Sequence, residues 1–110
     1  MIASYMIELT VPPNTPNSNP VSSTLSLGHG LLRSVNILFP SGTLGTVGVR
    51  ITEDGRPFLP MIGWIRDDGK EKSYTTMRRF QGPPYRLVIQ AYSIAADWPH
   101  TIFVGLEVGQ

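Results

Sequence analysis

Hydrophobic residues recur at every second position in several short stretches of the chain. In the first stretch, Tyr5, Ile7, Leu9 and Val11 recur in this way, with the polar residues Glu8 and Thr10 among them. This period of two is typical of a β-strand that lies with one face on a core. The same period predicts further strands over residues 21–27, 31–39, 47–51, 70–77, 85–92 and 100–108. In the stretch 31–39 the period runs through Leu31, Arg33, Val35, Ile37 and Phe39, which places these side chains on one face. In the last stretch, we expect the side chains of Ile102, Val104, Leu106 and Val108 to point inward.

Proline, asparagine and glycine residues separate these stretches. Pro12 and Pro13 end the first strand because proline has no N–H group to donate to a sheet. Residues 12–20 therefore form a loop that is long for a hairpin, and we expect it to carry the chain between two sheets or to act as a functional arm. Turns are predicted around residues 28–30, 40–42, 54–55 and 68–69.

The segment 56–66 is the hardest to interpret, because prolines and a glycine interrupt its large apolar residues. We interpret it as an irregular or edge element over the core. About seven or eight short strands without an amphipathic helix then predict an all-β fold. We expect residues 1–110 to form one antiparallel β-sandwich, jelly-roll-like or Greek-key in topology.

Size and composition agree with such a domain. A chain of 110 residues can bury one hydrophobic core without cross-links to stabilise it. The absence of cysteine excludes disulfides and zinc–thiolate sites. No window approaches the roughly 20 apolar residues of a membrane span, and the first residues lack signal-peptide features. We therefore expect no membrane partner and no processing.

Charge is sparse, since charged residues make up 15% of the chain and the net charge is +1. This is too little positive charge to predict a nucleic-acid partner. Few charges and many turn residues favour a domain whose surface is partly covered by a partner, although stable monomers can also be sparsely charged.

Candidate acid–base groups are few. His29 and His100 are the two histidines, and a solvated turn and a strand end, respectively, are their favoured roles. A catalytic triad assembled in space remains the alternative. The acidic pairs at 53–54 and 67–68 each precede a glycine, so turn chemistry is favoured over a calcium loop or a glycosidase dyad. We predict no catalytic residue, no cofactor and no metal site.

The aromatic residues Trp64, Trp98, Tyr74 and Tyr92 could form a platform on which a sugar stacks. A place in the core is favoured for most of them. Trp98 is the exception, because it lies in a loop between Asp97 and Pro99.

The stretch "RRF", with two lysines upstream, forms the one basic cluster of the sequence. A solvated rim is favoured over a partner site, although arginines are enriched in protein interfaces. The residues that we predict to contact a partner are Pro13, Asn14, Trp64, Arg78, Arg79 and Trp98.

Four phrases of the sequence carry a resemblance: "VPPNTP", "GLLRSVNILFPSGTLGTVGVRI", "PPYRLVIQAY" and "WPHTIFVGLEV". Together they resemble a group of small phage-encoded β-sandwich proteins that decorate or cement an icosahedral head. The segment 56–69 departs from that likeness, so the role of Trp64 stays open. The resemblance implies a virion protein that binds assembled capsid subunits and has no catalytic residues.

We therefore predict a non-enzymatic capsid decoration protein, made in the host cytoplasm and located on the capsid surface. Its partner would be the major capsid protein, and self-association into a trimer would match local threefold positions. The alternative is a carbohydrate- or receptor-binding module of a phage tail, using Trp98 and nearby tyrosines. An enzyme ranks third.

Overall fold

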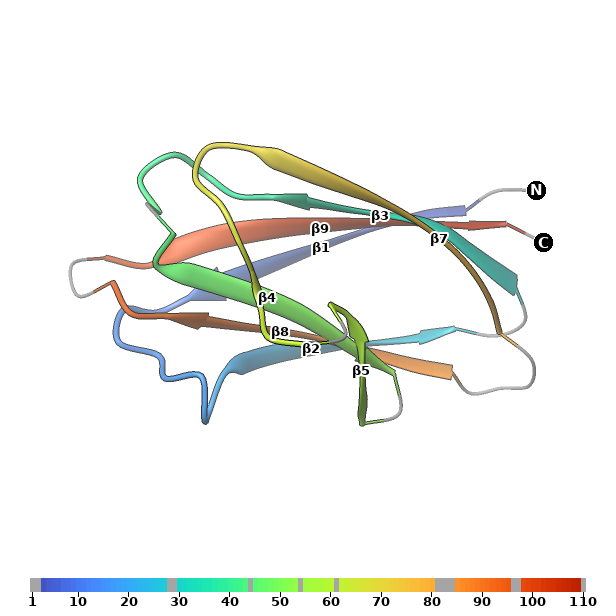
Figure 1. Ribbon diagram of the computed structural model, residues 1–110, viewed down its shortest axis with the longest axis horizontal. Helices are drawn as coiled ribbons and strands as arrows, with labels where there is room; N and C mark the ends of the chain where they lie inside the picture. Colours follow the sequence, from blue (N-terminus) through green and yellow to red (C-terminus); the bar gives the residue numbers. More distant parts are fainter. Residues whose placement is uncertain are drawn as a thin grey trace.

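The computed structural model describes residues 3–27, 30–43, 45–53, 55–60, 62–80, 85–95 and 98–109. Over these residues the chain forms nine strands and no helix, arranged as two antiparallel sheets packed face to face (Figure 1). The first sheet has the order β1 (Ala3–Val11), β9 (His100–Gly109), β3 (Gly30–Leu38), β7 (Glu71–Phe80). The second has the order β2 (Val21–Leu27), β8 (Tyr85–Ser93), β4 (Val47–Glu53), β5 (Arg56–Leu59), and β6 (Ile65–Arg66) also pairs with β4.

The predicted β-sandwich is thus confirmed, with more strands than the seven or eight expected. The additional strands, β5 and β6, lie within the segment 56–66 that we interpreted as irregular or edge. Both are short edge strands of the second sheet. Neither was predicted as a strand, because stretches of four and two residues are too short to show an alternation of apolar and polar residues.

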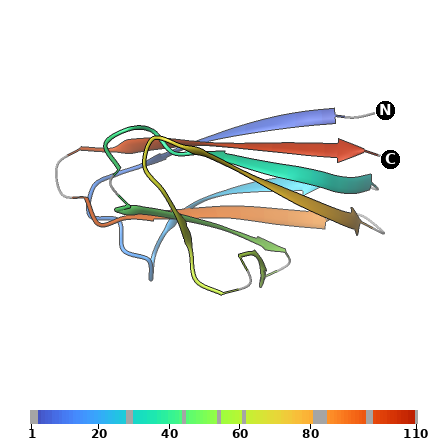
Figure 2. The same cartoon turned by 45° about the horizontal axis from the view of Figure 1, so that its top comes forward.

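Strand pairing defines the topology as a jelly roll. The pairs β1–β9, β2–β8, β3–β7 and β4–β5 form one long antiparallel ribbon. Successive pairs belong to alternate sheets, so the ribbon is rolled into the sandwich, which Figure 2 shows obliquely. Glu53 pairs with Arg56 at the tip of the ribbon, which confirms the hairpin predicted there, although Asp54 itself lies outside the described residues.

The loop over residues 12–20 joins β1 in the first sheet to β2 in the second, as the sequence predicted. It is held to the end of β8 by backbone hydrogen bonds. The N–H of Ser93 donates to the carbonyl of Thr15 at 2.9 Å, and the N–H of Asn14 donates to the carbonyl of Ala95 at 2.9 Å. This part of the loop therefore packs on its own domain.

The core lies between the sheets. The inward series of β9 is buried as predicted, and it faces buried residues of the second sheet (Val47, Val49, Ile51, Leu87, Ile89 and Ala91). Burial of each valine, leucine or isoleucine among them contributes about 1.5–3 kcal/mol of hydrophobic free energy. No helix among the described residues is long and apolar enough to cross a membrane.

The inward series predicted for β3 is wrong at its start. Leu32 is fully buried and Arg33 is exposed, whereas the sequence pattern placed Leu31 and Arg33 on the same face as Val35. The register against both neighbouring strands shifts between Leu32 and Ser34. Such a bulge adds one residue and reverses the alternation on either side of it.

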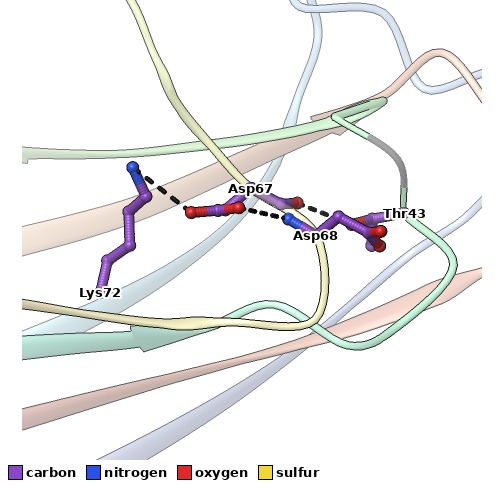
Figure 3. Close-up of polar contacts among 4 residues, drawn as sticks. All are labelled: Thr43, Asp67, Asp68 and Lys72. Atoms are coloured by element: carbon purple, nitrogen blue, oxygen red, sulfur yellow. Dashed lines mark hydrogen bonds and ion pairs between the residues drawn. The ribbon is translucent and has the colours of Figure 1, made fainter.

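A polar junction fixes the point where the chain returns from the second sheet to the first (Figure 3). Asp68 Oδ1 accepts a hydrogen bond from the N–H of Gly42 at 2.9 Å, and the hydroxyl of Thr43 donates to the carbonyl of Asp67 at 2.7 Å. Asp67 Oδ1 accepts from the N–H of Asp68 at 2.8 Å, and its Oδ2 lies 3.4 Å from the Lys72 ammonium. Both carboxylates thus serve turn chemistry, although the turn at 68–69 crosses between sheets and is no hairpin.

This junction makes the stability of the fold depend on pH. The backbone hydrogen bond from Asp68 holds the pKa of Asp67 below its ordinary value of 3.8; Lys72 acts in the same direction, and desolvation opposes both. The unfolded chain therefore binds a proton more readily at this residue than the folded chain does. The stabilisation is complete above the ordinary pKa and is lost as the pH falls through the folded pKa.

We predict that Asp67→Asn lowers the melting temperature at neutral pH, and that the difference from the wild type shrinks as the pH falls below about 4. Thermal melts followed by circular dichroism across the acid range measure this. Lys72→Gln keeps the backbone hydrogen bond, so it should retain most of the pH dependence. A constant difference between wild type and Asp67→Asn at every pH would contradict the assignment.

Candidate functional site

The outer face of the second sheet carries a cluster of arginine and aromatic side chains. Along β4 and β8, inward residues such as Val49 and Ala91 alternate with outward ones, and Arg50 pairs with Gln90 across the two strands. Trp64, ahead of β6, and Arg66, in β6, add to this face. The resulting arginine–aromatic cluster consists of Arg50, Trp64, Arg66, Gln90 and Tyr92.

Tyr92 owes its position to a glycine. It lies opposite Gly48 in the register, and a Cβ atom at Gly48 would come 2.7 Å from Tyr92 Cζ. The missing side chain thus lets the ring lie against the backbone of β4, where Tyr92 is buried on an outer face. Trp64 meets this ring edge-on, with centroids 4.8 Å apart and planes at 85°, an arrangement that aromatic pairs prefer.

The two arginines lie against these rings. The guanidinium carbon of Arg50 is 4.3 Å from the centroid of the Trp64 ring, and that of Arg66 is 5.9 Å from the centroid of Tyr92. Arg50 Nε also donates to Gln90 Oε1 at 2.7 Å, which fixes its orientation. Within the described ranges neither guanidinium forms an ion pair with a carboxylate.

The arginine–aromatic cluster is better suited to binding a ligand than to catalysing a reaction. The Nε of Arg50 already donates a hydrogen bond to Gln90. The two terminal nitrogens of its guanidinium group are therefore the ones that can bind a carboxylate or phosphate. An aromatic ring beside them offers apolar area for a ligand to stack on. The described part of the chain also contains no group of three or more residues that could hold a metal ion.

The predicted aromatic platform is only partly assembled. Trp64 and Tyr92 are together, but Tyr74 packs against the core from β7. Trp98 is 62% exposed ahead of β9, and it makes no ring contact within the described residues. The sequence analysis did not identify Arg50 as a site residue, because only the register of β4 and β8 shows that it lies beside Gln90.

The predicted basic cluster is divided by its contacts. Arg78 binds Glu53 of β4 through two hydrogen bonds, of 3.1 Å from Nε and 2.9 Å from Nη2. Lys72 is paired with Asp67, whereas Arg79 is exposed. Arg78 thus joins β7 of the first sheet to β4 of the second, and Lys72 binds the connection between β6 and β7. Both cations therefore have a structural role.

The other predicted site residues lie elsewhere. Pro13 is half-buried and Asn14 is exposed, both in the loop that is held to the end of β8. His100 is buried at the start of β9, opposite Val11. His29 lies outside the described residues.

A second feature, on the outer face of the first sheet, is a shallow hollow of about 260 Å³. It exists because Gly105, in the central strand β9, has no side chain to fill it. Met6 is 70% exposed and Leu38 is 40% exposed beside it. We call it the Gly105 hollow; its lining residues are Met6, Asn36, Leu38, Glu71, Phe103 and Gly105.

Comparison with known proteins gives no family. No family model matches the chain, and no curated protein matches it. Among solved structures, the crystal structure of FlhE matches with a TM-score of 0.49 and 15% identity, over 99% of this chain and 98% of that one. The crystal structure of PirA matches with a TM-score of 0.39 and 14% identity, over 93% of each chain. Likenesses at this level do not indicate a shared function.

We predict that Gly48→Ala lowers the free energy of unfolding by about 1–3 kcal/mol, because the new methyl group must displace the Tyr92 ring. Denaturant unfolding measures the loss, and near-ultraviolet circular dichroism should report a changed environment of Trp64. Gly105→Ala is the matched control: its Cβ would meet Met6 Cε at an ordinary 3.5 Å. Equal losses for the two variants would show that Tyr92 is not the cause.

Proposed function

We propose that this chain is a non-enzymatic structural protein that binds the assembled shell of a phage capsid. The observation that carries the proposal is the outer face of the first sheet, where apolar side chains remain exposed around the Gly105 hollow. Exposed apolar surface on a small domain is typical of a face that a partner covers. The sparse charge of the chain agrees with such a role.

Three of the described acidic residues make structural contacts, which agrees with a role without catalysis. Asp67 and Asp68 accept hydrogen bonds within the junction of two turns, and Glu53 is paired with Arg78. These carboxylates hold the domain together. They are therefore poor candidates for a general acid or base that must act on a substrate.

The fold supports the proposal only by analogy. Jelly rolls occur in viral capsid proteins and also in lectins, so the topology is compatible with both of the functions predicted from the sequence. In a decoration protein, copies bridging neighbouring subunits of the major capsid protein would add their binding free energy to the stability of the shell. Repetition over a symmetric shell makes contacts of about 1,600 Å² collectively strong.

We predict that the purified protein sediments with undecorated heads of the encoding phage, and that Met6→Asp weakens this binding at least about tenfold by placing a charge beside the Gly105 hollow. Ile94→Asp is the matched control, because Ile94 is also exposed but follows β8 at the end of the sandwich. Failure of the wild type to sediment in mild salt would remove the proposal. Equal binding by Met6→Asp would exclude this face.

A second candidate function is carbohydrate binding, and the arginine–aromatic cluster favours it. Trp64 supplies a ring for stacking, and the terminal nitrogens of Arg50 suit the carboxylate of an acidic sugar. The site lies on the opposite sheet from the Gly105 hollow. It replaces the exposed Trp98 as the centre of this alternative.

We predict that, if the domain binds sugars, a glycan array selects carboxylated over neutral oligosaccharides. Trp64→Ala should then reduce binding at least about tenfold, and Arg50→Gln should abolish the preference for acidic sugars. Trp98→Ala serves as the control and should leave binding unchanged. Thermal melts establish that each variant is folded. Loss of binding in Trp98→Ala alone would move the site to that loop.

A further inference from the structure

Four edges bound the two sheets, and they differ in how far they resist pairing with another chain. An edge strand presents unpaired N–H and C=O groups, so proteins protect edges with bulges, prolines, charges or short strands. The edges are β1 and β7 in the first sheet, and β2 and the β5–β6 side in the second.

One side of the sandwich carries these protections. β7 bulges opposite the break in β3, with Met77 at a φ of 51°, and it bears Lys72 and Arg78. On the same side of the sandwich, β5 has four residues including Pro57, and β6 has two. Arg78 and Lys72 of β7 also form ion pairs on this side of the sandwich. Pairing with another strand is therefore disfavoured here.

β1 has only one of these protections, a single charge. It runs for nine residues in unbroken register with β9, without proline or bulge, and Glu8 is its one charged residue. β2, on the same side, is shorter, and its exposed residues are hydroxyl-bearing. β1 therefore offers the longest regular edge of the described domain.

Burial along β1 also indicates an incomplete core. Val11 is fully buried and Leu9 nearly so, but Ile7 is half-buried and Tyr5 is 38% exposed, although all four belong to the inward series. The inner face of this edge thus opens toward the start of the strand. A strand added beside β1 would place side chains over Tyr5 and Ile7.

We propose that β1 pairs antiparallel with β1 of a second copy of this chain, joining two four-stranded sheets into one of eight strands. The sequence is self-complementary for this. A two-fold axis at Met6 places Glu8 opposite Ser4, and an axis at Ile7 places it opposite Met6, so in neither register do the two glutamates face each other. With the axis at Met6, Tyr5 of each chain faces Ile7 of the other; with the axis at Ile7, the two Ile7 residues face each other and Tyr5 faces Leu9. In either register the inward series of both chains continues across the axis.

This inference rests on the edge alone and is independent of capsid or sugar binding. We expect analytical ultracentrifugation of the full chain to show a concentration-dependent monomer–dimer equilibrium. A protein that remains monomeric up to about millimolar concentration would overturn the proposal.

Cysteine scanning locates the interface, because the chain contains no cysteine of its own. Residues directly opposite in antiparallel strands have Cα atoms about 4.5–5.5 Å apart, which a disulfide can span. We expect Met6→Cys or Ile7→Cys to form a homodimeric disulfide under mild oxidation, according to the register. The matched controls Thr24→Cys on β2 and Ser73→Cys on β7 should remain monomeric. Dimers linked through a control position, with none through β1, would place the interface elsewhere.

Discussion

The structure depends on burying every second side chain between two sheets. This constraint decides which residues of β4 and β8 enter the core and leaves the others to form the outer faces. Arg50 and Gln90 are neighbours outside because Ile51 and Ile89 are neighbours inside. The candidate sites are therefore products of the same packing that stabilises the domain.

The two outer faces have different chemistry. One has a hollow at Gly105 with exposed apolar side chains, and the other has arginines against aromatic rings. In both, a glycine of a central strand makes the feature, by leaving space at Gly105 and by admitting the Tyr92 ring at Gly48. The domain can thus present two unlike surfaces without changing its core.

The sequence was sufficient to predict the sandwich, the inward face of β9 and the connection between the two sheets at residues 12–20. Each of these features depends on a local period of hydrophobic residues or on proline. It failed at Leu32 and Arg33, where the bulge is fixed by the partner strands and leaves no local signal. The arginine–aromatic cluster could not be predicted from the sequence for a related reason. Arg50 and Gln90 are 40 residues apart, and only the register of β4 with β8 brings them together.

The rolled ribbon has a consequence for how the domain assembles. Glu53 of β4 pairs with Arg56 of β5, three residues further along, whereas Ala3 pairs with Val108 from nearly the opposite end of the chain. Joining segments so far apart costs loop-closure entropy that nearer contacts must first offset. We therefore expect folding to start at the central hairpin and proceed outward, with the outermost pair closing last.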